Sequence, residues 1–125
     1  MERAAKRILV VDDFEDSRFS LSRLLEIEGY EVLEAADGAQ AIEKALSENP
    51  DLILMDMSLP IIDGMSATRQ IKAQLGRVPI IALSAHDGAD YQIRAKEAGC
   101  DDYVTKPVDF DGLLSLISIK LVQNN

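Results

Sequence analysis

The chain has 125 residues, of which 47% are hydrophobic, and its 13 basic and 22 acidic side chains give a formal net charge of -9 at pH 7. This length suits one domain with a two-sided core, and the negative charge opposes direct binding to nucleic acid or to anionic membranes. No apolar run approaches the ~20 residues of a membrane span or the core of a secretory signal. Cys100 is the single cysteine, so we expect a small core residue, a reducing compartment and a cytoplasmic protein.

Five apolar runs alternate with segments of helical character, which is the pattern of a parallel sheet covered by helices. The runs lie at residues 8–11, 30–35, 52–55, 78–83 and 103–105. The second run includes Glu31 and Glu34, and these charges favour a strand at the edge of the sheet. Because no repeat or flexible linker interrupts the pattern, we expect a single α/β domain over residues 1–125 with its core at about residues 6–122.

Capping residues mark the ends of the expected helices. Asp37 followed by Gln40 predicts a capping box at the start of the second helix, and Asn49-Pro50 is expected to end that helix. Three glycines stand where a left-handed C-terminal cap is expected: Gly29, Gly76 and Gly99. The last helix is predicted to pack one apolar stripe on the sheet, made of Phe110, Leu113, Leu114, Ile117 and Leu121.

Polar residues follow four of the five apolar runs. They are Asp12-Asp13, Asp56, Ser84 and Lys106-Pro107. Each signal alone is weak, because an acidic pair, a serine or a Lys-Pro after a strand is more often a helix cap or a loop. Ligand sites in open parallel sheets lie outside the carboxyl ends of the strands, so these residues are expected to converge. The four placements together therefore predict one pocket with three carboxylates, a hydroxyl and an ammonium group.

Three clustered carboxylates need a compensating charge. Two such groups 4 Å apart repel by roughly 4 kcal/mol at an effective dielectric constant near 20. Mg²⁺ prefers oxygen ligands and binds through one or two carboxylates together with phosphate oxygens, so Asp12, Asp13 and Asp56 suit it. One aspartate could then act as a nucleophile toward phosphorus. Lys106 and Ser84 would supply a charge and a hydrogen bond to the oxygens of an incoming phosphoryl group.

Four segments closely resemble the receiver domain of bacterial two-component response regulators. They are residues 8–13, 56–64, 83–85 and 103–107. The resemblance extends over about residues 6–122, essentially the whole chain. It implies a flavodoxin-like (βα)5 three-layer sandwich, with a five-stranded parallel sheet in the strand order 2-1-3-4-5.

The resemblance also implies a role for each acidic residue. Asp56 would be the phosphoacceptor. Mg²⁺ would be bound by Asp13, Asp56 and the backbone carbonyl of Ser58, with Asp12 acting largely through water. Ser58 and His86 occupy positions that vary in the family and tune the lifetime of the aspartyl phosphate, and His86 is expected to be an exposed loop residue.

Further residues are implied to act as the switch. Lys106 and Ser84 would contact the phosphoryl oxygens, and the Lys106-Pro107 peptide bond would be cis. In the family the residue at the Ser84 position moves toward the phosphoryl group and the aromatic at the Tyr103 position turns inward. Phosphorylation would thereby reshape the face of the fourth helix, fifth strand and fifth helix for partner binding.

The function implied is that of a phosphoacceptor switch in a two-component phosphorelay. A sensor histidine kinase or a histidine phosphotransfer protein would donate the phosphoryl group, and a protein target would act downstream. The chain would catalyse only its own phosphorylation and dephosphorylation, as a monomer or weak dimer. Two alternatives are a degenerate receiver, which normally lacks the acceptor, acid pair or lysine, and a Mg²⁺-dependent aspartyl-phosphate phosphatase. The phosphatase would have Asp-x-Asp after the first strand, where this chain has Asp12-Asp13-Phe14.

Overall fold

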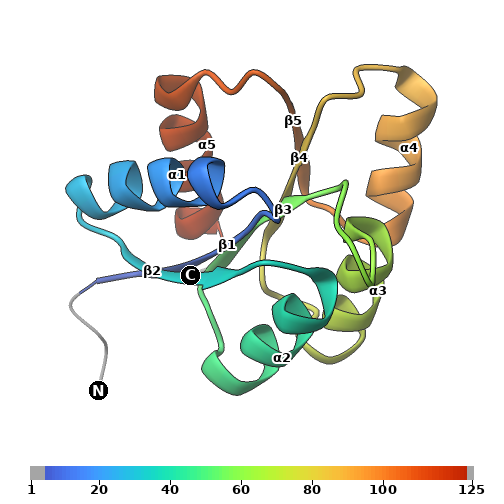
Figure 1. The fold of residues 1–125 in the computed structure, drawn as a ribbon, viewed down its shortest axis with the longest axis horizontal. Coiled ribbons are helices and arrows are strands. Elements are labelled where there is room, and N and C mark those ends of the chain that lie inside the picture. Colours follow the sequence, from blue (N-terminus) through green and yellow to red (C-terminus); the bar gives the residue numbers. More distant parts are fainter. Residues whose placement is uncertain (1–4, 124–125) are drawn as a thin grey trace.

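The computed structural model describes residues 5–123, which form five strands and five helices in strict alternation (Figure 1). The strands are β1 (Arg7–Val11), β2 (Glu31–Ala35), β3 (Leu52–Asp56), β4 (Ile80–Ser84) and β5 (Asp102–Thr105). The helices are α1 (Glu15–Ile27), α2 (Gly38–Glu48), α3 (Gly64–Gln74), α4 (Ala89–Ala98) and α5 (Phe110–Gln123). β2 begins one residue later than expected and β4 two residues later. The outermost residues of the predicted domain, 1–4 and 124–125, lie outside the described part.

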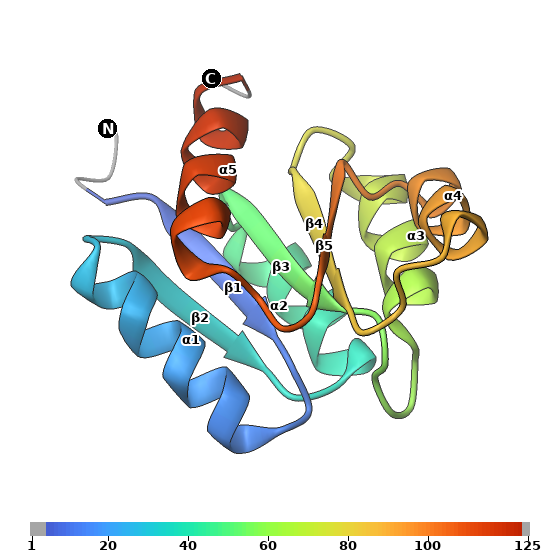
Figure 2. The ribbon, with the colours of Figure 1, turned by 90° about the horizontal axis from the view of Figure 1, so that it is seen from above.

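All strand pairs are parallel, and the sheet order is β2-β1-β3-β4-β5. Figures 1 and 2 show α1 and α5 on one face of this sheet and α2, α3 and α4 on the other. The predicted flavodoxin-like three-layer sandwich is therefore confirmed. β2 lies at an edge, as its two glutamates predicted, and both Glu31 and Glu34 are exposed.

Alternate residues of the strands feed two separate cores, because successive side chains of a strand point to opposite faces. Leu9, Ile53 and Met55 belong to the cluster shared with α2, α3 and α4. Ile8 and Leu54 belong to the cluster shared with α1 and α5. The central strands are thus covered on both faces, which explains their unbroken apolar sequences.

The fifth helix and Cys100 bury as predicted. Leu113 and Ile117 are buried in the second cluster, and Phe110, Leu114 and Leu121 pack partly buried against it. Cys100 is buried beside Thr68, and burial raises the pKa of its thiol. Within residues 5–123, no helix has the length and apolar character needed to cross a bilayer.

Most of the predicted caps form. Gly29 and Gly99 have φ values of 99° and 117°, and Asn49, with φ 48°, ends α2. The expected left-handed cap at Gly76 is wrong. Helix α3 ends at Gln74. The cap residue Leu75 has a φ of -123° and its N–H donates to the carbonyl of Ile71 at 2.7 Å, so the chain leaves the helix without a left-handed residue.

The start of α2 carries the predicted capping residues, with one difference in detail. The N–H of Gln40 donates to Oδ1 of Asp37 at 2.8 Å, as the capping box requires. The side chain of Gln40 reaches back to the N–H of Ala36 at 2.9 Å, one residue before the cap. The capping pair therefore also orders the end of the β2–α2 connection.

Candidate functional site

Every residue of the predicted pocket lies at the carboxyl end of a strand. Asp12 and Asp13 follow β1, Asp56 and Ser84 are the last residues of β3 and β4, and Lys106 follows β5. In Figure 2 the arrowheads of β1, β2 and β3 point toward the same edge of the sheet. Asp12, Asp56 and Ser84 are buried, with 7%, 5% and 1% of their surfaces exposed, whereas Asp13 is exposed.

Three of these side chains are held by the backbone two residues further along. In each case the side-chain oxygen accepts a hydrogen bond from a backbone N–H, a turn typical of Asp and Ser. The pairs are Asp12 Oδ1 with Phe14 at 2.9 Å, Asp56 Oδ1 with Ser58 at 2.9 Å, and Ser84 Oγ with His86 at 3.1 Å. One oxygen of each carboxylate is thereby fixed, and the second remains for other partners.

Lys106 joins the end of β5 to the centre of the site. Its Nζ donates a hydrogen bond of 3.1 Å to Oδ2 of Asp56, while its backbone N–H donates to the carbonyl of Ser84 at 2.7 Å. The Lys106-Pro107 peptide bond is cis, as the family resemblance implied. The structure thus brings together the charged residues that the sequence placed after separate strands.

The three carboxylates form a cluster of hard oxygen ligands. One oxygen each from Asp12, Asp13 and Asp56 lies within 4.8 Å of the other two. The pKa of Asp12 is raised, chiefly because burial disfavours its charged form and then because Asp56 and Asp13 are negative. The N–H of Phe14 and the Lys106 ammonium lower that pKa and offset part of the rise. The donor set and the uncompensated charge fit a small dication.

The predicted switch residues lie on the side of β4 and β5. The hydroxyl of Tyr103 donates to the carbonyl of His86 at 2.7 Å, and the ring of Tyr103 meets the edge of Tyr91 at 6.2 Å. His86 is exposed in the β4–α4 loop, as expected, and it stacks on Tyr91 at 4.4 Å. The loop after Ser84 is therefore tied to β5 through an aromatic group and a hydrogen bond.

Two glycines allow the loop after Asp56 to pack closely. A Cβ atom at Gly64 would collide with the carbonyl oxygen of Asp56 and with Met57, and one at Gly38 would collide with the backbone of Ile62. Asp63 caps α3, accepting from the N–H of Ser66 at 2.9 Å. The connection from β3 to α3 is consequently held against the starts of both α2 and α3.

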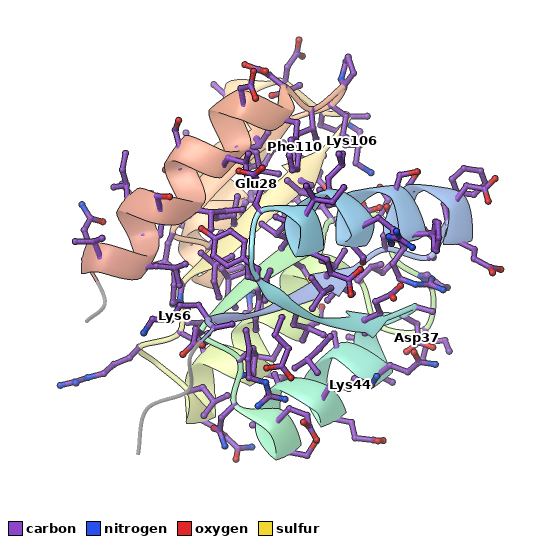
Figure 3. All side chains as sticks on the ribbon, turned by 90° about the vertical axis from the view of Figure 1, so that its left-hand side faces the viewer. Lys6, Glu28, Asp37, Lys44, Lys106 and Phe110 are labelled. Carbon is purple, nitrogen blue, oxygen red and sulfur yellow. The ribbon has the colours of Figure 1, made fainter. Side chains whose placement is uncertain are left out.

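An apolar groove adjoins the charged cluster between α1 and the β5–α5 connection. Its walls include Leu21, Leu24, Val108 and Phe110, and Asp12 and Lys106 lie at its edge. Figure 3 shows Lys106 and Phe110 close together on the side of the molecule where α1 and α5 lie. No pattern in the sequence predicted this groove.

Arg18 was also missed by the sequence analysis. Its Nη1 donates to the carbonyl oxygen of Asp12 at 2.9 Å, and its Nε donates to Glu34 at 3.0 Å. An arginine in the second turn of a helix has no sequence signal that separates this contact from a solvated side chain. The contact depends on how α1 lies beside β2.

The match to known proteins covers almost the whole chain. Residues 8–118 match the family model described as the response regulator receiver domain. The chain belongs to the response regulator receiver domain family. The match includes the strand-end residues Asp12, Asp13, Asp56, Ser84 and Lys106, which the fold brings to one edge of the sheet.

The curated relatives of this receiver domain differ in length. The transcriptional regulatory protein PrrA of Mycobacterium tuberculosis is 43% identical over 101 residues, which cover 81% of this chain and 43% of PrrA. Protein PilH of Pseudomonas aeruginosa is 38% identical over 117 residues, which cover 92% of this chain and 97% of PilH. The receiver domain thus spans less than half of PrrA and nearly all of PilH.

Solved structures agree with the fold. The CheY-like receiver domain protein of Methanospirillum hungatei has a TM-score of 0.92 at 31% identity, with 97% of each chain covered. The receiver domain of sensor histidine kinase PA1611 of Pseudomonas aeruginosa has a TM-score of 0.87 at 38% identity, with 94% of this chain and 98% of that chain covered. That second structure has a magnesium ion coordinated in its active-site cleft.

Proposed function

We propose that this receiver domain is a phosphoacceptor switch that takes a phosphoryl group from a phosphohistidine onto Asp56. The donor would be a sensor histidine kinase or a histidine phosphotransfer protein. The observation that carries the proposal is the Lys106–Asp56 contact of 3.1 Å beside the three-carboxylate cluster. This contact supports the proposal because it would bring the acceptor carboxylate, a cation and the candidate metal ligands into one site.

In the proposed transfer, a carboxylate oxygen of Asp56 attacks phosphorus. A P–O bond forms, the P–N bond to the donor imidazole breaks, and the imidazole leaves with the electron pair of that bond. Lys106 exchanges its contact with Asp56 for a contact with a phosphoryl oxygen, which keeps its charge next to the developing negative charge. The backbone N–H of Ser58 already donates a hydrogen bond to Oδ1 of Asp56, and this bond orients the carboxylate.

We propose Mg²⁺ as the cofactor. Asp13, Asp56 and the backbone carbonyl of Ser58 would bind it directly and Asp12 through water, and the clustering of the three carboxylates supports this assignment. When bound, the ion would neutralise phosphoryl oxygens and the repulsion among the aspartates. The magnesium ion in the PA1611 receiver structure supports the same choice.

We propose that Ser84 and Tyr103 transmit the phosphorylated state to a protein target. Ser84 would donate its hydroxyl to a phosphoryl oxygen and give up its bond with the N–H of His86. The loop that carries His86 is bonded to Tyr103, so a shift there would reach the face of α4, β5 and α5. The apolar groove beside Lys106 would receive the phosphodonor protein, because its lining includes Lys106, which contacts Asp56.

The same proposal includes a single receiver domain over residues 1–125 that acts in the cytoplasm as a monomer or weak dimer. The net charge of -9 supports the absence of direct nucleic acid contact. The domain would catalyse only its own phosphorylation and dephosphorylation. No observation favours the degenerate receiver or the phosphatase, since the acceptor, acid pair and lysine converge and no Asp-x-Asp follows β1.

Intact mass after incubation with acetyl phosphate and Mg²⁺ tests the proposal. The parent protein is expected to gain one phosphoryl group and Asp56→Asn none. Asp90→Asn, which alters an exposed aspartate of α4, is the matched control and should be modified like the parent. Phosphorylation of Asp56→Asn would refute the acceptor, an unmodified parent would indicate a degenerate receiver, and continued release of phosphate from unrelated phosphate esters would indicate a phosphatase.

A further inference from the structure

Arg18 makes two contacts that link helix α1, strand β2 and the acidic loop. Its guanidinium donates from Nη1 to the carbonyl oxygen of Asp12 at 2.9 Å and from Nε to Oε1 of Glu34 at 3.0 Å. Only 18% of the Arg18 side chain is exposed, compared with 62% for Arg23 on the same helix. The planar guanidinium is suited to bind two acceptors at once, so Arg18 acts as a brace: it fixes the Asp12 carbonyl relative to Glu34 of β2.

The contact with Asp12 completes the fixation of that residue. The N–H of Asp12 donates to the carbonyl of Ala35 at 3.1 Å, and its Oδ1 accepts from Phe14. With the carbonyl held by Arg18, the peptide group between Asp12 and Asp13 has a fixed orientation, because a peptide unit is planar. The backbone position from which the Asp13 side chain extends is fixed as well.

Asp13 needs such backbone support more than its neighbours do. Among residues 5–123, no hydrogen bond or ion pair to the Asp13 carboxylate is found, although it lies in the cluster with Asp12 and Asp56. Asp12 and Asp56 are fixed by the N–H groups of Phe14 and Ser58. The alignment of Asp13 with the other two carboxylates therefore depends on its own main chain.

We propose that Arg18 is a positioning residue for the cation site: it holds the Asp12 carbonyl so that the Asp13 carboxylate stays aligned with Asp12 and Asp56. This inference rests on the proposed Mg²⁺-dependent function and deepens it. Glu34 contributes to the same arrangement. Its carboxylate balances the positive charge of the Arg18 guanidinium, which would otherwise repel a cation bound nearby.

The direction of the change in Mg²⁺ affinity distinguishes a positioning role of Arg18 from an effect of its charge alone. Removing a positive side chain near a cation site strengthens cation binding if only electrostatics matters. Removing a brace weakens it, and loss of outer groups that orient metal ligands typically reduces affinity about 10–100-fold. Arg18→Met removes both the charge and the two hydrogen bonds, so the two explanations predict opposite changes in the Mg²⁺ dissociation constant.

Calorimetric titration of chelator-treated protein with Mg²⁺ makes the test. Arg18→Met is expected to bind Mg²⁺ about tenfold more weakly than the parent. Arg18→Lys keeps the positive charge but loses the planar guanidinium that binds two acceptors, so its affinity for Mg²⁺ should lie between those of the other two proteins. Arg23→Met is the control, since it removes the same charge from the exposed side of α1 and should leave the affinity unchanged.

Equal or tighter Mg²⁺ binding by Arg18→Met would overturn the positioning role while leaving the proposed function in place. A loss of thermal stability without a change in the dissociation constant would also overturn it, because a purely structural role predicts that result. If Arg18→Met does not fold, Arg18→Lys carries the test, because it keeps the positive charge and is still expected to weaken Mg²⁺ binding. A parent protein that neither binds Mg²⁺ nor accepts a phosphoryl group would overturn the inference and the proposed function together.

Discussion

The ammonium nitrogen of Lys106 lies 3.1 Å from Oδ2 of Asp56, although the two residues are 50 positions apart in the sequence. Asp56 is 5% exposed, and the Lys106 side chain is 33% exposed. The pair therefore places a positive charge against a largely buried carboxylate that has Asp12 and Asp13 as its neighbours. In the metal-free protein this contact offsets part of the repulsion within the cluster.

Replacing Lys106 should destabilise the metal-free protein. Lys106→Met leaves Asp56 buried without its cation, and we expect a loss of about 1–2 kcal/mol, less than for a fully buried pair because water reaches the lysine. Urea unfolding in the presence of a chelator measures the change. Lys96→Met, at an exposed position of α4, is the control, and an equal free energy of unfolding in both variants would contradict the prediction.

Removing the acids one at a time should rank their importance for the metal. We expect Asp13→Ala to weaken Mg²⁺ binding by at least about tenfold and Asp12→Ala to weaken it less, because direct ligation contributes more than contact through water. Asp13→Ala should also stabilise the metal-free fold by relieving repulsion. Calorimetric titration ranks the variants, and an Asp13→Ala protein with the affinity of the parent would exclude this site.

The raised pKa of Asp12 predicts a pH dependence of stability. Because burial raises this pKa in the folded protein above the ordinary value of 3.8, the folded state binds the proton more tightly than the unfolded state. The stabilising contribution of protonated Asp12 is present at low pH and is lost as the pH rises through the folded pKa. Metal-free Asp12→Asn should therefore be more stable than the parent at neutral pH.

The measurement is the free energy of unfolding of both proteins at several pH values in chelator. The advantage of Asp12→Asn is expected to narrow as the pH falls toward 3.8. Saturating Mg²⁺ should reduce the difference at neutral pH, because the ion stabilises the charged form in the parent. A difference that is constant with pH would mean that burial does not penalise the Asp12 carboxylate.

Ser84 and Lys106 should be needed for the conformational switch more than for phosphorylation. Beryllofluoride, an aspartyl-phosphate mimic, is expected to move the amide NMR signals of residues 84–106 in the parent, and these changes should be reduced in Ser84→Ala and Lys106→Ala. In the proposed function Lys106 would also assist the transfer, but both side chains would hold the phosphoryl group once it is on Asp56, and the switch would depend on that contact. Identical shift changes in all three proteins would place the switch elsewhere.

Much of the fold followed from local sequence. The charges of Glu31 and Glu34 predicted the edge strand, because an edge strand has side chains that reach water. The unbroken apolar sequences of β1 and β3 agree with their central places, where helices cover both faces. The prediction for Gly76 was wrong, although Gly76 follows α3 at the same spacing as Gly29 follows α1. The difference lies in the residue before the glycine: Leu75 already leaves the helical conformation with φ -123°, so the chain turns there without a left-handed glycine.

The sequence predicted those parts of the site that lie at the carboxyl ends of strands. Asp56 and Lys106 meet because β3 and β5 are parallel and end at the same edge, and topology alone gives that result. The brace at Arg18 was not predictable, because it depends on the angle of α1 and on side-chain reach to Asp12 and Glu34. A side-chain contact between two elements depends on how they are oriented, and this orientation produces no periodic pattern of residues in the sequence.

The close approach at Gly38 and Gly64 also constrains how this domain can diverge. The backbone of residues 57–63 is held between two helix starts, with no space for a side chain at either glycine. An insertion in that stretch would push α2 and α3 away from the strand that carries Asp56, and a deletion would break the close contacts at Gly38 and Gly64. Exposed side chains of this stretch, such as those of Ser58 and Ile61, can therefore change chemically while the length of the backbone stays fixed.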